Sequence, residues 1–189
     1  MQPRNLWCLL AAALAVPAST AGAADELVVE AERRGERIEV RARAVVAARV
    51  ALVWQALTDY EHLPGFIPGI SRSSVRLREG NRLLVEQAGE ARFLIFSLPI
   101  EVRLEVTESP PDWISSRAVG GNLRRMNGRY ELQPDDSRGT VALRYYGEIE
   151  PDFPLPPVVG LVALRLMVEE QFTAMVAEIE RRAASRDPK

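Results

Sequence analysis

The stretch that decides the fold is PPVVGLVALRLMVEEQFTAMVAEIERR, residues 156–182. Proline suits the first turn of a helix but not its interior, so Pro156 and Pro157 are expected to open a helix. Beyond them, apolar residues recur at spacings of three and four and form one stripe on a helix surface: Leu161, Leu164, Val168, Phe172, Met175 and Ile179. The spacing predicts a long C-terminal helix that lays this stripe on another layer of the protein.

The first half of this helix is more apolar than one buried stripe requires. Val159, Val162 and Leu166 form a second patch, about 120–160° round the helix from the stripe at 100° per residue. A surplus of apolar surface here suits a lipid-sized pocket. It also suits an exposed, transient contact with a membrane or a protein partner.

The first residues are expected to be a cleaved signal peptide rather than part of the domain. Arg4 gives a short positive start, residues 6–16 are apolar, and Ala21-Gly22-Ala23 offers the small-x-small cleavage pattern. The apolar run is too short for a membrane span. We therefore expect residues 1–23 to be removed, residues 24–189 to form one domain, and the mature protein to be periplasmic.

Composition excludes several kinds of chemistry. Cys8, the only cysteine, lies in the expected signal peptide, so the mature chain has no thiol for a disulfide, for catalysis or for a metal. The only histidine, His62, lies in a turn and is expected to be exposed and structural, which leaves no zinc site. The net charge of −2 indicates no nucleic-acid partner. We assign no catalytic residue, metal or cofactor.

The rest of the chain alternates between apolar and polar residues, as strands of a half-exposed sheet do. Residues 50–57, with Val50, Val53, Trp54 and Leu57 on one face, predict a short helix, and residues 60–70 a second short helix or turn. The long segment 92–107 is expected to be one strand bent at Pro99. The complete set of expected strands is 27–32, 36–46, 73–79, 82–88, 92–107, 113–119, 123–133 and 139–150.

This order predicts an α+β fold. We expect a curved antiparallel sheet of about six to seven strands wrapped round the C-terminal helix, with two short helices after the first strand. One helix covers so wide a sheet only if the sheet curls around it. The curl would leave a gap between sheet and helix, and that gap is the candidate pocket.

Four local sequences resemble those of a known superfamily. Residues 53–69 read VWQALTDYEHLPGFIPG, and residues 108–112, 127–130 and 139–141 read ESPPD, NGRY and GTV. They resemble the SRPBCC superfamily, also called START-like or Bet v 1-like, and within it the polyketide cyclase/dehydrase and coenzyme-Q-binding START-like branch. The resemblance covers about residues 38–182. It implies a helix-grip fold with a deep apolar cavity, but it does not choose among transport, sensing and ring closure.

Eleven residues are candidates for binding a ligand in that cavity. Arg165 could hold an acidic group or a quinone oxygen, or extend along its stem to water. Phe66 could gate the pocket or plug the core, and Gln87 and Tyr145 could donate hydrogen bonds to an apolar ligand. The full set is Phe66, Gln87, Phe96, Leu104, Met126, Tyr130, Tyr145, Leu161, Arg165, Val168 and Phe172.

Three functions fit these patterns. The first is binding or carriage of a hydrophobic small molecule such as a lipid, an isoprenoid or a quinone. The second is a cyclase or aromatase type of enzyme, which needs an acid or base at the cavity; Arg165, Tyr145 and Glu148 are its candidates. The third is a contact module that uses the patch of Val159, Val162 and Leu166. The sequence favours the first, without enzymatic activity.

Overall fold

A computed structural model describes residues 27–93, 96–152 and 157–186. Its centre is an antiparallel sheet of eight strands in the order β1-β2-β8-β7-β6-β5-β4-β3. The strands are β1 (Val28–Arg34), β2 (Arg37–Val46), β3 (Ile70–Glu79), β4 (Arg82–Phe93), β5 (Phe96–Ser109), β6 (Trp113–Gly121), β7 (Leu123–Asp135) and β8 (Thr140–Pro151).

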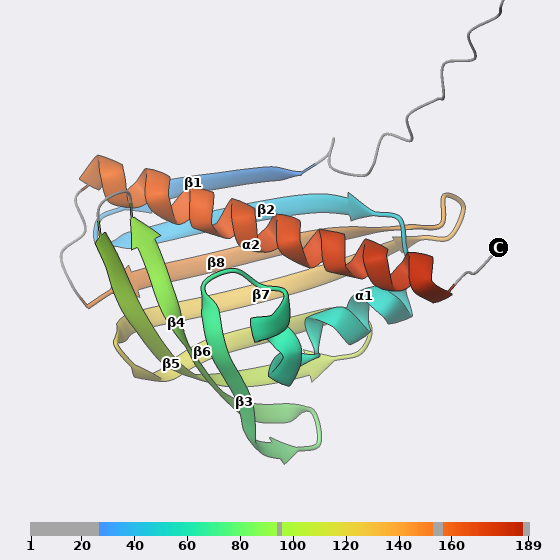
Figure 1. Ribbon diagram of the computed structural model, residues 1–189, viewed down its shortest axis with the longest axis horizontal. Helices are drawn as coiled ribbons and strands as arrows, with labels where there is room; N and C mark the ends of the chain where they lie inside the picture. The colour runs from blue at the N-terminus through green and yellow to red at the C-terminus, as the bar shows by residue number, and fades with distance from the viewer. Residues whose placement is uncertain (1–26, 94–95, 153–156, 187–189) are drawn as a thin grey trace, which may run out of the picture.

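Three helices complete the described part of the domain. The helix α1 (Val50–Leu57) and the 3-10 helix η2 (Tyr60–Gly65) connect β2 to β3, and the long helix α2 (Pro157–Arg186) follows β8. Figure 1 shows α2 lying along one face of the sheet, with α1 beside its C-terminal half. Contacts of α2 reach β1 and β2 at one side of the sheet and β4 near the other. The predicted helix-grip fold is confirmed.

The alternation in β2 shows why one face of the sheet is covered. Ile38, Val40 and Val46 are at most 1% exposed, whereas Arg41 and Arg43 between them are exposed. Because side chains alternate between the two faces of a strand, the apolar set packs toward α2 and the arginines face water.

The predicted stripe of α2 supplies the other side of the core. Phe172 and Ile179 are almost fully buried, whereas Val162 and Leu166 are about half exposed. The buried set is Leu164, Val168, Phe172, Met175, Val176 and Ile179. Burial of this stripe on the sheet, rather than helix propensity, stabilises so long a helix.

Three details of the predicted topology are wrong. The sheet has eight strands rather than six or seven, and both short helices follow the second strand. The segment expected as one strand over 92–107 is divided, because β4 ends at Phe93 and β5 begins at Phe96, and these two residues pair. No Gly, Pro, Asn or Asp marks this turn, so the sequence carries none of the usual turn signals there.

The C-terminal half of α2 is fastened to the connection that contains η2. The guanidinium of Arg182 donates to Asp59 over 2.8 Å and lies 5.3 Å from the centre of the Phe66 ring. His62, which is exposed as predicted, has Nδ1 2.6 Å from the other oxygen of Asp59. These contacts close one end of the space between helix and sheet.

Candidate functional site

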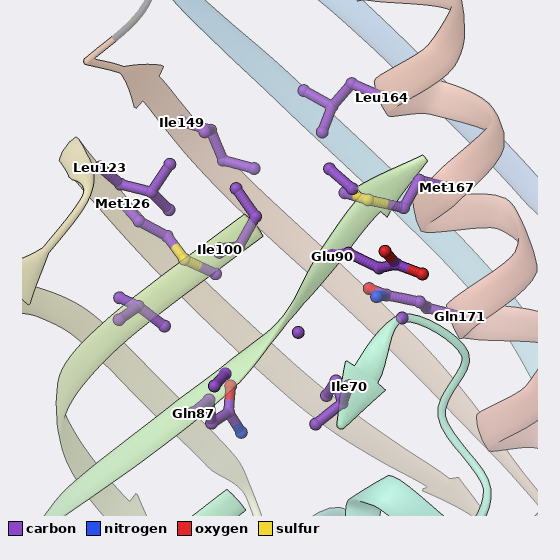
Figure 2. Close-up of a pocket in the computed structure, with 15 residues that line it drawn as sticks. Ile70, Gln87, Glu90, Ile100, Leu123, Met126, Ile149, Leu164, Met167 and Gln171 are labelled. Carbon is purple, nitrogen blue, oxygen red and sulfur yellow. The ribbon is translucent and has the colours of Figure 1, made fainter. Parts of the chain in front are cut away.

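A cavity of two adjoining chambers lies between the sheet and α2. The front chamber, of about 150 Å³, is shown in Figure 2, where Leu164, Met167 and Gln171 reach from α2 toward Ile149 on the sheet. The inner chamber, of about 170 Å³, lies deeper, between η2, α2 and the middle strands. Ile70, Gln87, Met126 and Gln171 line both chambers, and so mark the place where they meet.

The inner chamber has an aromatic floor. The rings of Tyr130 and Tyr145 lie 4.7 Å apart at an angle of 42°, and Tyr130 stacks on Phe172 of α2 at 6.3 Å. Because Tyr130 and Tyr145 pair across β7 and β8, the sheet register fixes this arrangement. The stacking of Phe172 on Tyr130 therefore fixes the distance between α2 and this part of the sheet.

Two glycines give the Tyr145 ring its place. Gly128 and Gly147 pair across β7 and β8, and a Cβ added at Gly147 would lie 2.5 Å from the Tyr145 hydroxyl oxygen. A Cβ at Gly128 would lie 3.2 Å from the same oxygen. The ring therefore lies over the pair of glycines, and the space above it is left to the cavity.

The polar groups of the inner chamber are neutral. Among the described residues, the hydroxyls of Tyr130 and Tyr145 have no hydrogen-bond partner, so both can donate to a ligand. Burial raises the pKa of Tyr145 to about 12, and burial also raises the pKa of Tyr130. Both phenols therefore stay protonated at neutral pH. Gln87 donates to the buried Ser73 hydroxyl over 3.4 Å, which fixes a third polar group beside them.

The front chamber is bounded by the connection from η2 to β3. The Gln171 amide donates to the Pro68 carbonyl oxygen over 3.0 Å and so ties this connection to α2. A Cβ added at Gly89 would overlap the carbonyl group of Gly69, so the connection lies directly against β4. Glu90, which lies beside Gln171 in the lining, is the one carboxylate among the lining residues of either chamber.

Within the described ranges, no three His, Cys, Asp or Glu side chains are placed to hold a metal ion together. None of the described helices combines the length and apolar character that crossing a lipid bilayer would require.

A protein-family profile matches most of the chain. The sequence profile described as "Polyketide cyclase / dehydrase and lipid transport" matches residues 46–176. The chain belongs to this family. The match runs from the end of β2 through most of α2 and so includes every element that lines the cavity. A comparison with curated proteins gives no match.

Solved structures share the fold at low sequence identity. An aromatase/cyclase of Streptomyces sp. R1128 has a TM-score of 0.65 at 16% identity, over 79% of this chain and 95% of its own. A START superfamily protein of Mycobacterium smegmatis scores 0.61 at 16%, over 79% and 99%. A STAR-related lipid transfer protein of Xanthomonas axonopodis scores 0.62 at 13%, over 82% and 99%. These likenesses show that the fold is shared, and the proteins that share it include an aromatase/cyclase and a lipid transfer protein.

Most of the residues that the sequence predicts to bind a ligand do lie on the cavity. Seven of the eleven line it: one each from β4, β5 and β8, two from β7 and two from α2, so they come together from segments far apart in the sequence. They are Gln87, Leu104, Met126, Tyr130, Tyr145, Val168 and Phe172.

Three predicted residues lie elsewhere. The guanidinium of Arg165 donates to the Val29 carbonyl oxygen of β1 over 3.3 Å and pairs with Glu169 at 3.0 Å, so it faces the edge of the sheet rather than the cavity. Phe66 packs against the core under Arg182, as the plug interpretation expected. Leu161 is half-buried against the core, outside both linings.

Two further predictions fall on side chains that the structure does not describe. These are Phe96, expected in the cavity, and Val159, expected in the second apolar patch of α2. Val162 and Leu166, the other two members of that patch, are 49% and 51% exposed.

Sequence reasoning missed two polar residues of the front chamber, Gln171 and Glu90. Gln171 is not part of the apolar stripe of α2, and its contact with Pro68 depends on where the η2–β3 connection crosses α2. Glu90 stands on β4 after a shift in register between Ile70 and Arg72 of the neighbouring strand. Because side chains alternate between the two faces of a strand, a Gln87 that faces the cavity predicts that Gly89, and not Glu90, faces it as well. The local sequence therefore gives no signal for this carboxylate.

Proposed function

We propose that this protein binds and carries a hydrophobic small molecule in the cavity between the sheet and α2. The observation that carries the proposal is the pair of adjoining, mostly apolar chambers with a few polar groups, which is the usual composition of a small-molecule pocket. Only the two chambers together approach the roughly 300 Å³ at which such pockets begin. An elongated ligand that occupies both chambers fits this shape best.

The polar groups suggest the chemistry of the ligand. The inner chamber offers phenol and amide donors but no charged side chain among its lining residues, and a buried ionised group without a partner is strongly disfavoured. The ligand would therefore be neutral, with an apolar body and one or two acceptor oxygens that reach Tyr130 and Tyr145. Isoprenoids with a carbonyl or quinone end have this character. The expected signal peptide would deliver the carrier to the periplasm.

A cyclase or aromatase type of enzyme is the second candidate. Of its three candidate residues only Tyr145 lies on the cavity, since Arg165 faces β1 and Glu148 pairs with Arg37 at 2.9 Å on the outer face. With its pKa raised to about 12, Tyr145 can donate a proton or a hydrogen bond but is a poor base at neutral pH. Binding and carriage need only the hydrogen-bond donors that the site has, whereas catalysis would also need a base.

Exposure of Val162 and Leu166 favours a surface contact as well. These side chains lie on the front half of α2, the same half that lines the front chamber through Leu164 and Met167. A contact here would place a partner or membrane beside the cavity, which a carrier needs when it loads or releases its ligand.

Native mass spectrometry of the purified protein, with extraction of whatever co-purifies, tests carriage directly. We expect one class of neutral, oxygen-bearing lipid at close to one molecule per chain, with its mass unchanged on incubation. Conversion of the extracted molecule to a ring-closed product would support the enzyme instead. Protein that emerges empty and fails to bind any neutral lipid supplied to it would contradict both.

A further inference from the structure

The outer face of the sheet, opposite α2, carries a second hollow. It is a groove of about 410 Å³ formed where β1, β2, β8 and β7 lie side by side. Four arginines line it, two of them on β2 and one each on β8 and β7: Arg41, Arg43, Arg144 and Arg129. In a chain whose net charge is −2, such a concentration of guanidinium groups is a local exception.

The strand register places these arginines in two adjacent rows. In one row Arg43 stands directly opposite Arg144, and in the next Arg41 and Arg129 flank Tyr146 on either side. Neighbouring strands lie about 5 Å apart and alternate residues on one face about 7 Å apart. All four side chains can therefore reach one small anion.

Two of the four arginines are already engaged. Arg41 pairs with Glu39 at 3.2 Å and lies 5.8 Å from the Tyr146 ring. Arg129 pairs with Glu131 at 2.7 Å and stacks at 4.4 Å on the ring of Trp113. These contacts hold the two guanidiniums in place at the sides of the groove.

Arg43 and Arg144 differ from them. Both are exposed, and neither makes a hydrogen bond, an ion pair or a ring contact with any residue that the structure describes. Like charges directly opposite each other on neighbouring strands destabilise a sheet. Glu131 lies beside Arg144 in the register but is held by Arg129, and Glu30 lines the groove from the edge strand β1.

We propose that this groove binds a phosphate-bearing ligand, with Arg43 and Arg144 as its principal contacts. One guanidinium group can bind both oxygens of a carboxylate through a bidentate pair of hydrogen bonds. A phosphate has enough oxygens to accept such pairs from two guanidinium groups on different sides. The phosphate would neutralise the two facing charges that are unpaired in the protein alone. This site is separate from the cavity, because it lies on the opposite face of the sheet, and it goes beyond the proposed carriage.

The decisive variant is Arg43→Gln/Arg144→Gln, and Arg72→Gln/Arg82→Gln is its matched control. The control removes the same charge from exposed positions of β3 and β4, at the far side of the sheet order. Calorimetric titration with inorganic phosphate at constant ionic strength, and co-sedimentation with phosphatidylcholine vesicles with or without phosphatidylglycerol, distinguish a free phosphate from a lipid headgroup.

We expect the Arg43/Arg144 variant to bind roughly tenfold more weakly or worse, and the control variant to bind as the unmodified protein does. Saturable binding of inorganic phosphate identifies the free group as sufficient; binding to the anionic vesicles alone identifies the headgroup as the source. Binding of neither probe, or an equal loss in both variants, would overturn the proposal. Removal of the facing charges should leave the melting temperature equal or higher, and a melting curve for each variant separates a loss of binding from a loss of the fold.

Discussion

The Tyr60 hydroxyl donates a hydrogen bond of 2.9 Å to a carboxylate oxygen of Glu108, and both residues are buried. Arg78 donates to the other oxygen over 3.2 Å. Burial raises the pKa of Tyr60, as does the neighbouring Glu108 carboxylate, so the hydroxyl remains a donor at all ordinary pH values. Since Tyr60 also lines the inner chamber, this bond sets the position of one cavity wall.

Replacement of Tyr60 by Phe should lower the free energy of unfolding by about 1–3 kcal/mol, because it leaves a buried carboxylate oxygen without its donor. Urea unfolding measures the change. The matched control is Tyr146→Phe, which removes the same hydroxyl from a ring that is 40% exposed, and its effect should stay within about 0.5 kcal/mol. Equal losses in the two variants would show that the bond to Glu108 contributes nothing.

Substitution of Gly147 by Ala should displace the Tyr145 ring. The added methyl group would meet the hydroxyl oxygen at 2.5 Å and ring carbons at 2.8 Å, so the ring must move toward the cavity. We expect a loss of about 1–3 kcal/mol in stability and weaker binding of the neutral fluorophore N-phenyl-1-naphthylamine. In a Tyr145→Ala background the same substitution should have almost no effect. A full loss in that background would contradict the proposed role of the glycine.

Replacement of Met126 by Trp should block the cavity where its chambers meet, since Met126 lines both. Binding of N-phenyl-1-naphthylamine should fall at least tenfold, measured by fluorescence titration. Val162→Trp adds an indole to the exposed face of α2 and should leave this binding unchanged. A melting curve for each variant separates a blocked cavity from a damaged fold.

The phenols predict selectivity for ligands with an acceptor oxygen. Tyr130→Phe and Tyr145→Phe should each weaken binding of the neutral quinone decylubiquinone about threefold to tenfold, because a neutral hydrogen bond contributes about 1 kcal/mol. Both should bind N-phenyl-1-naphthylamine, which has no carbonyl, as before. Because the pKa of Tyr145 is about 12, the quinone affinity should not vary across the neutral pH range. Equal losses for both probes would point to packing rather than hydrogen bonding.

A carboxylate in the C-terminal half of α2, that of Glu178, should make the stability of the fold depend on pH in the acid range. Hydrogen bonds from Arg181 and then Arg182 lower the pKa of Glu178 from 4.5 to about 2. A carboxylate with a depressed pKa in the folded state stabilises the fold above its unfolded pKa, and that stability is lost as the pH falls from about 4.5 toward 2.

Glu178→Gln should therefore melt at a lower temperature than the unmodified protein at pH 7, and the difference should shrink as the pH falls through this window. Thermal melts followed by circular dichroism at a series of pH values measure it. Glu170→Gln, at an exposed position of the same helix, should show no such convergence. A difference that stays constant down to pH 2 would contradict the assignment.

The sequence predicted those parts of the fold that depend on periodicity. The stripe of α2 and the alternation of β2 are visible in the chain because one face of each is buried, and the same alternation placed Tyr130 and Tyr145 on the cavity. The hairpin between Phe93 and Phe96 could not be predicted, because its apolar residues carry no turn signal.

The cavity residues that were missed depend on contacts between distant segments. Gln171 reaches Pro68 across 103 residues, and Arg165, which pattern alone allowed in the cavity, is drawn to the Val29 carbonyl across 136. A helical wheel gives the direction of a side chain but not the neighbouring segment toward which it points. For the same reason the arginine groove emerges only when the register of β2, β8 and β7 is known.

The pairing of β2 with β8 has a consequence for biosynthesis. Nine residue pairs join these strands, from Ile38 with Ile149 to Val46 with Val141. The strand β2 therefore cannot complete its pairing until β8, more than 90 residues later in the sequence, has been synthesised. Until the ribosome has released β8, one edge of β2 has no partner and its apolar side chains have no helix to cover them. Folding of this domain is therefore expected to wait for the synthesis of β8 and α2 and to be slow for a domain of this size, so the emerging chain is expected to need chaperones.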